Sequence, residues 1–245
     1  MEQNLEKIIK DFIEGNYEEY PKEYSVAASA GLNDDDENKY IYNEFSFQHE
    51  LGSFLREKLS GEGYKIKFEK NFKKIYKIGE KGHDKSECDI LIMKGKEKYA
   101  IELKYLKNKA YPYRMYQCVQ DMEFMYKAKE IEGMKATYCV VVTENTGFYE
   151  KQKDDNKLLG ENEALYNMYK DKIENMKESE IKKLPIIYKY FRDSNGDWER
   201  GDYVVSNLKN GAEPINIKEF KDKIKFEWKS VTKKNEKVRY YILKF

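Results

Sequence analysis

Two carboxylates and a lysine carry the clearest chemical signal in this 245-residue sequence. Asp89 precedes the apolar run 90–93, and Glu102 and Lys104 lie in segment 99–105, where apolar and polar residues alternate. A short β-branched run and an alternating run are both typical of strands. Because side chains alternate along a strand, Glu102 and Lys104 should point to the same face. The sequence thus predicts ionisable groups on strands that are otherwise apolar.

The turn between these strands decides which residues meet. If Gly95 and Lys96 form a two-residue loop, or if residues 94–97 form a four-residue loop, Asp89 lies directly opposite Glu102. A three-residue loop would shift the pairing by one position and send the two acids to opposite faces. The site hypothesis therefore depends on the first register.

Two carboxylates at facing positions repel each other and are costly to bury without compensation. Mg²⁺ would compensate them, because it takes oxygen ligands from one or two carboxylates and leaves positions for water and phosphate. Mn²⁺ could substitute for it. Lys104 is placed to orient a water molecule or to stabilise charge on a phosphate. Because 37% of the residues are charged, such a pattern of acids and lysine is also expected by chance. The simpler alternative is that both acids form ion pairs with neighbouring lysines.

Asp89, twelve further residues and then Glu102, Leu103 and Lys104 resemble the signature of the PD-(D/E)xK nuclease superfamily. Cys88 stands where that signature has proline. The resemblance implies the restriction-endonuclease-like fold, an α/β core with a mixed central sheet flanked by helices. It also implies that Asp89, Glu102 and the main-chain carbonyl of Leu103 bind Mg²⁺, while Lys104 orients the attacking water.

In this superfamily an acid from the helix before the hairpin often completes the metal site. A broad apolar face that includes Phe45 predicts such a helix over residues 39–60. Glu50, at the edge of that face, is the preferred metal ligand, with Glu44 and Glu57 as rivals. An ordinary surface glutamate is the alternative.

Further substrate contacts are predicted around the hairpin, either from the resemblance or from nearby charge. For each of them a plain surface or loop position is the alternative. The candidates are Gln117, Gln120, Lys107, Lys109 and His83.

Hydrophobic periodicity predicts the elements that position these residues. Strand 136–143 is almost continuously apolar, which is typical of a strand covered on both faces. A helix joining it to strand 98–105 makes a right-handed parallel crossover.

Residues 1–37 are predicted as a helix and an acidic connection, 38–145 as the nuclease-like core, and 146–245 as a helical, β-rich elaboration. The predicted segments are helices 1–15, 39–60 and 112–132, loops 33–37 and 73–86, a helical segment 150–183, and strands 64–72, 184–192, 198–206, 224–231 and 238–245.

Composition excludes several classes of protein. The net charge is +1, so any surface for nucleic acid must be local. Three cysteines without CxxC spacing argue against a disulfide framework, and two histidines are too few for common zinc enzymes. The 22 tyrosines could supply stacking surfaces, although an AT-rich genome is the favoured explanation for them. Without a signal peptide or an 18-residue apolar run, we expect a soluble, cytoplasmic chain that makes no membrane contact.

The sequence therefore predicts a Mg²⁺-dependent phosphodiesterase acting on nucleic acid, with DNA favoured over RNA. The resemblance favours an endonuclease of restriction or defence type. The alternative is a non-catalytic binding module that retains the nuclease fold. A homodimer is compatible with either function.

Overall fold

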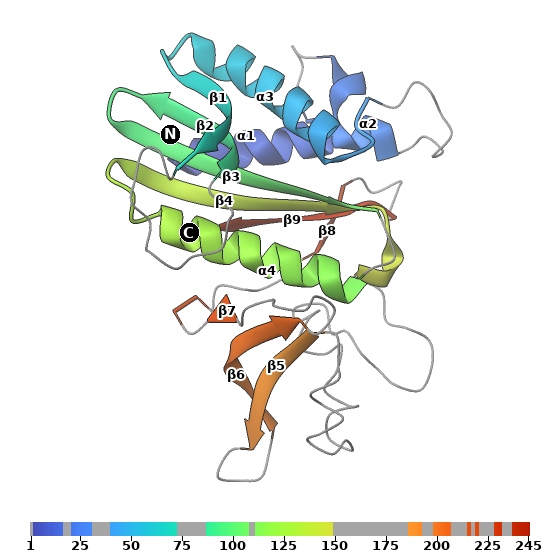
Figure 1. Ribbon diagram of the computed structural model, residues 1–245. Coiled ribbons are helices and arrows are strands. Elements are labelled where there is room, and N and C mark those ends of the chain that lie inside the picture. Colours follow the sequence, from blue (N-terminus) through green and yellow to red (C-terminus); the bar gives the residue numbers. More distant parts are fainter. Residues whose placement is uncertain are drawn as a thin grey trace. The chain divides into compact units, whose positions relative to one another are not determined.

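The computed structural model describes residues 2–16, 21–30, 40–72, 87–107, 111–148, 186–192, 198–206, 215–216, 219–220, 228–231 and 237–245. These residues form two compact units (Figure 1). The first unit comprises Met1–Tyr105, Phe124–Glu144 and Lys229–Phe245, and the second comprises Leu106–Glu123 and Asn145–Trp228. The predicted loops 33–37 and 73–86 and the helical segment 150–183 lie outside the described residues.

The described elements alternate between helices and strands, so the protein is mixed α/β. In chain order they are α1 (Glu2–Glu14), η1 (Lys22–Tyr24), α2 (Val26–Ala30), α3 (Glu44–Ser60), β1 (Lys65–Asn71), β2 (Glu87–Lys94), β3 (Glu97–Leu106), α4 (Tyr111–Ala128), β4 (Met134–Thr143), η2 (Thr146–Phe148), β5 (Ile186–Arg192), β6 (Trp198–Ser206), β7 (Ile215–Asn216), β8 (Lys229–Ser230) and β9 (Arg239–Lys244).

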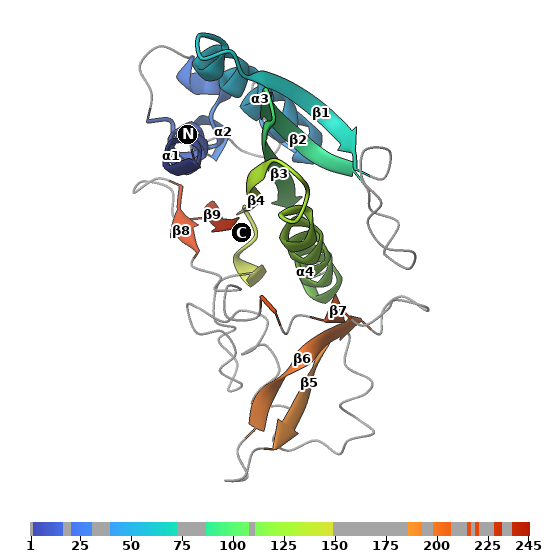
Figure 2. The same cartoon turned by 90° about the vertical axis from the view of Figure 1, so that its left-hand side faces the viewer.

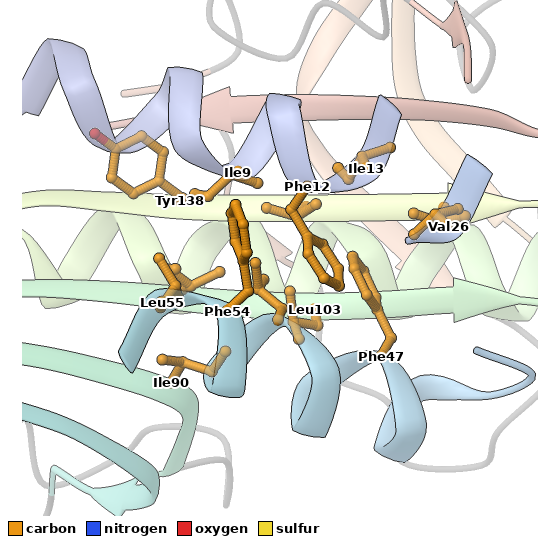
Figure 3. Close-up of a cluster of buried hydrophobic side chains, with 14 of the residues drawn as sticks. Ile9, Phe12, Ile13, Val26, Phe47, Phe54, Leu55, Ile90, Leu103 and Tyr138 are labelled. Atoms are coloured by element: carbon orange, nitrogen blue, oxygen red, sulfur yellow. The ribbon is translucent and has the colours of Figure 1, made fainter. Parts of the chain in front are cut away.

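A six-stranded mixed sheet in the order β1-β2-β3-β4-β9-β8 forms the centre of the first unit (Figure 1). The neighbouring strands are antiparallel except for β3 and β4, whose arrowheads point the same way in Figure 3. Helix α4 joins these two strands, so the predicted parallel crossover is present. The last strand, β9, inserts beside β4 and thereby extends the sheet.

The register of the β2–β3 hairpin is the predicted one. Lys94 pairs with Glu97 and Leu91 with Ala100, so the loop is the two-residue turn that begins with Gly95. Gly95 has a φ of +57°, which glycine adopts without the steric cost that a side chain would impose. The sequence prediction for this turn is therefore confirmed.

Helix α3 begins at Glu44, five residues later than the predicted start at residue 39. The Asn43 side chain accepts a hydrogen bond from the Ser46 backbone N–H, and the Ser46 hydroxyl accepts one from the Asn43 N–H, which together form a capping box. Such a cap satisfies N–H groups that the first turn leaves without helical partners. The cap also turns Phe45 outward, so its prediction as part of the apolar face is wrong: it is 69% exposed.

Helices α1 and α3 cover one face of the sheet, and phenylalanines fill the space between them (Figure 3). The Phe12 ring of α1 lies 5.3 Å from the Phe54 ring and 6.3 Å from the Phe47 ring, both on α3. All three are buried, and Leu103 of β3 belongs to the same cluster. Burying each large side chain contributes about 1.5–3 kcal/mol to folding.

The C-terminal part of α4, Phe124–Ala128, covers the opposite face of the sheet. The Thr137 hydroxyl of β4 donates a hydrogen bond of 2.7 Å to the Met125 carbonyl, whereas neighbouring Tyr138 packs in the α1–α3 cluster. Figure 2 shows α1 and this C-terminal part of α4 on opposite sides of β3 and β4. Both faces of β4 are therefore covered, as its almost continuously apolar sequence predicts.

The second unit contains a three-stranded sheet in the order β5-β6-β7. Strands β5 and β6 pair antiparallel, which confirms the predicted hairpin of 184–192 and 198–206. Within the part of the chain that the structure describes, none of the helices has both the length and the apolar character needed to cross a membrane.

Candidate active site

The hairpin opens at the position where its acids lie. The β2–β3 ladder ends at the pair Ile90–Ile101, one residue before Asp89 and Glu102. Beyond it, the Asp89 carboxylate takes the place of a backbone partner, because its Oδ2 accepts a 2.6 Å hydrogen bond from the Leu103 N–H. The two strands therefore diverge at the predicted site, and one carboxylate spans the gap between them.

Glu102 and Lys104 are both buried, at 2% and 9% exposure. Burying charged groups is costly unless partners compensate for the lost hydration. Lys104 has a partner in Glu44, whose Oε1 lies 3.3 Å from its Nζ. Clusters of buried ionisable groups are common at functional sites, and ion-pair networks with a structural role also form them.

Cys88 precedes Asp89 on β2, and its thiol is buried. Burial is the main cause of the raised pKa of Cys88, and the carboxylates of Glu102 and Asp89 raise it further. A buried thiol with a raised pKa is a poor nucleophile, and we assign Cys88 no catalytic role.

Glu44 is the acid of α3 that reaches the hairpin. Besides its ion pair with Lys104, its Oε2 accepts a hydrogen bond of 3.4 Å from the Tyr105 N–H. It was a rival candidate in the sequence, and its side chain is 43% exposed. Glu44 is the first residue of α3, so its carboxylate lies at the helix N-terminus.

Gln48, one turn further along α3, contacts the other strand of the hairpin. Its Nε2 donates a 2.8 Å hydrogen bond to the Asp89 carbonyl, and the residue is buried. Residues four apart lie on the same side of a helix, so Glu44 and Gln48 face the hairpin together. The one side chain binds β3 and the other binds β2, so α3 holds the two strands at a fixed separation. Sequence analysis missed Gln48, although its spacing from Glu44 was visible.

Glu50 lies on another side of α3. Its Oε1 lies 2.9 Å from Nδ1 of the exposed His49. The pKa of Tyr24, in the segment before α2, is raised chiefly by Tyr40 and burial, and more weakly by Glu23 and Glu50. Glu50 lies between Phe47 and Phe54 in the helix, and the rings of both phenylalanines pack against Phe12 of α1. Glu50 is therefore on the side of α3 near α1 and not on the side that faces the hairpin. The other rival, Glu57, is exposed.

Strand β1 is irregular beside Asp89. Its ladder with β2 passes from the Phe68–Ile90 pair to the Lys70–Cys88 pair, and Glu69 between them has a left-handed φ of +45°. A non-glycine residue in this conformation costs about 1–3 kcal/mol, and such strain clusters at functional sites. Both neighbours of β2 therefore depart from regular pairing at Asp89.

The predicted substrate contacts fall in different parts of the chain. Gln117, Gln120 and Lys107 are half-buried residues of the second unit, and the Gln117 side chain accepts a 2.9 Å hydrogen bond from Arg114. Lys109 and His83 lie outside the described residues. All five assignments stay predictions.

The donors at the hairpin are carboxylate and carbonyl oxygens, the ligand type that Mg²⁺ prefers. Among the residues the structure describes, no group of three or more His, Cys, Asp and Glu side chains could hold a metal. Asp89 and Glu102 are two carboxylates of the chemical type that Mg²⁺ takes alongside water and phosphate. No protein-family model, curated protein or solved structure matches the chain.

Proposed function

We propose that this protein is a Mg²⁺-dependent phosphodiesterase that cleaves nucleic acid, with DNA as its substrate and internal bonds as its target. One observation carries the proposal. The hairpin opens at Asp89 and Glu102, and a buried lysine on the same strand face stands beside them. Defence against foreign DNA is the biological role that the resemblance to the PD-(D/E)xK superfamily favours.

The residues of the chain have distinct roles in this reaction. Asp89 and Glu102 would bind Mg²⁺ together with the Leu103 carbonyl, and the ion would supply charge neutralisation at the phosphate. Lys104 orients a water molecule whose oxygen attacks phosphorus in line with the leaving oxygen. The attacking water releases a proton to solvent, the bond from phosphorus to the leaving oxygen breaks, and the leaving alcohol takes up a proton from solvent. Glu44 fixes the Lys104 ammonium through their ion pair.

The direct test measures cleavage of supercoiled plasmid, linear duplex, single-stranded DNA and RNA with Mg²⁺, Mn²⁺ or EDTA. We expect metal-dependent nicking of plasmid by the wild type and its loss in Lys104→Met. Lys96→Met, at an exposed position of the same hairpin, is the matched control and should cut normally. A protein that cuts none of these substrates, and whose Tm no metal raises, would contradict the proposal in favour of a binding module.

Gln48→Met tests whether α3 sets the separation of the two strands. The substitution keeps the length of the side chain but removes the hydrogen bond to the Asp89 carbonyl. We expect a 10–100-fold loss of activity, about the range for groups that support a metal ligand. A stability loss of about 1 kcal/mol should accompany it. Cleavage rates measured against Mn²⁺ concentration would check this, and an unchanged Mn²⁺ dependence would count against the positioning role.

A further inference from the structure

Two exposed aromatic side chains flank Glu44. Phe45 is 69% exposed and Tyr42 is 53% exposed, and with Tyr40 they are the large exposed hydrophobic residues of the described chain. Single exposed apolar residues are common and need no explanation. Here, however, all three fall within the six residues 40–45, which span the start of α3.

The backbone that carries these rings is firmly held. The Tyr42 N–H donates a 3.0 Å hydrogen bond to the Ser46 hydroxyl, inside the capping box. One residue earlier, the buried Ile41 donates its N–H to the Ser29 hydroxyl at 3.0 Å. Phe45 is the second residue of the helix itself. The rings therefore project from a preorganised segment, which reduces the entropy lost when a ligand binds to them.

The Tyr40 ring contacts another ring of the protein, whereas the rings of Tyr42 and Phe45 are exposed to solvent. The Tyr40 ring packs edge-on against Tyr24 with their centroids 4.4 Å apart. Tyr42 and Phe45, which we call the aromatic pair, have exposed Asn43 and half-buried Glu44 between them in the chain. Two rings separated by polar residues are too small for a stable protein interface, which needs about 800 Å² from each partner. Their size suits one or two nucleobases.

The position of the aromatic pair relative to Lys104 indicates which kind of ligand the pair binds. Glu44 contacts Lys104, and consecutive Cα atoms are about 3.8 Å apart, so both rings start within about 8 Å of the Glu44 Cα. A polynucleotide bound at Lys104 would therefore have nucleotides within reach of this segment. Bases inside a duplex are already stacked on one another, whereas an unpaired base offers its face to an aromatic side chain.

We propose that the aromatic pair stacks on unpaired nucleotides beside the bond to be cut, so that the substrate is single-stranded or locally opened DNA. The inference rests on the proposed function and adds the substrate class to it. It also explains why the aromatic pair is exposed to solvent on a well-ordered backbone segment near the buried Glu102 and Lys104.

Binding without cleavage tests the inference separately from catalysis. The probe is a fluorescein-labelled 20-mer, as single strand and as blunt duplex, titrated with protein in EDTA and followed by anisotropy. We expect tighter binding of the single strand, and about 10-fold weaker binding of it for each of Tyr42→Ala and Phe45→Ala. Tyr42→Phe and Phe45→Tyr should restore it, and Glu57→Ala on the exposed side of α3 should change nothing.

A spectroscopic readout distinguishes stacking from a general loss of structure. 2-Aminopurine in the single strand should be quenched by the wild type and by both aromatic replacements, but not by the alanine variants. Metal-dependent cleavage with equal binding of duplex and single strand in all variants would overturn the stacking inference and leave the proposed function standing. Absence of both cleavage and binding would overturn both. A concentration-dependent dimer that the alanine variants abolish would assign the aromatic pair to self-association and overturn the stacking inference.

Discussion

Glu102→Gln is expected to abolish metal-dependent cleavage while leaving the protein folded and at least as stable as the wild type. The substitution keeps the shape of the side chain and removes its charge. If the carboxylate helps to hold Mg²⁺ at the phosphate, its loss should cost about 4 kcal/mol of transition-state stabilisation, which is about 10³-fold in rate. Plasmid nicking rates at saturating Mg²⁺ give this ratio directly.

Thermal stability should not fall with activity in Glu102→Gln. Glu102 is 2% exposed, and a neutral amide in that place costs less to bury than a carboxylate. Sites that bind metals and substrates commonly carry such a stability cost. We therefore expect a Tm that is unchanged or raised, together with the loss of any Mg²⁺-induced rise in Tm.

Glu97→Gln is the matched control, because it makes the same change at a half-buried position on the same strand, next to the turn. It should retain both cleavage and the response of Tm to metal. If Glu102 served only in a structural ion pair, Glu102→Gln would instead lower the Tm. That result, combined with normal cleavage, would contradict the proposed site.

The second large effect is expected at Gly133, in the turn between α4 and β4. Its φ is +81°, and a Cβ atom there would lie 2.1 Å from the Lys96 carbonyl oxygen. That oxygen belongs to the backbone of the β2–β3 turn and cannot rotate away as a side chain could. The contact is part of how the two turns join, because the Lys98 N–H donates a 2.9 Å hydrogen bond to the Gly133 carbonyl.

Gly133→Ala should therefore lower the free energy of unfolding by about 3 kcal/mol or more, from left-handed strain and backbone displacement together. For a chain of this size that corresponds to a Tm lower by roughly 6–12 °C. Thermal unfolding followed by circular dichroism measures it.

Two other glycines separate the causes of this loss. Gly63 has a φ of +77° but open space around its Cβ position, so Gly63→Ala should show the strain alone, about 1 kcal/mol. Gly61 has neither feature, and Gly61→Ala should be nearly neutral. Equal losses at residues 63 and 133 would show that the Lys96 contact relaxes without cost.

Local patterns in the sequence determined the hairpin. The two-residue turn beginning with Gly95 fixes the register, and the register places Asp89 and Glu102 directly beyond the last ladder pair. Periodicity likewise predicted α1, the edge strand β1 and the parallel β3–β4 crossover. These features depend on residues close together in the chain, so the sequence contains the information for them.

Only the tertiary structure decided which acid of α3 meets the hairpin. The helix packs against both α1 and the sheet, so its apolar face is wide, and Glu50 and Glu44 lie at different edges of it. Periodicity finds that face but does not identify which edge meets which partner. Gln48 and the exposed Phe45 were missed for the same reason. The insertion of β9 beside β4 joins segments about a hundred residues apart, a contact that local patterns do not encode.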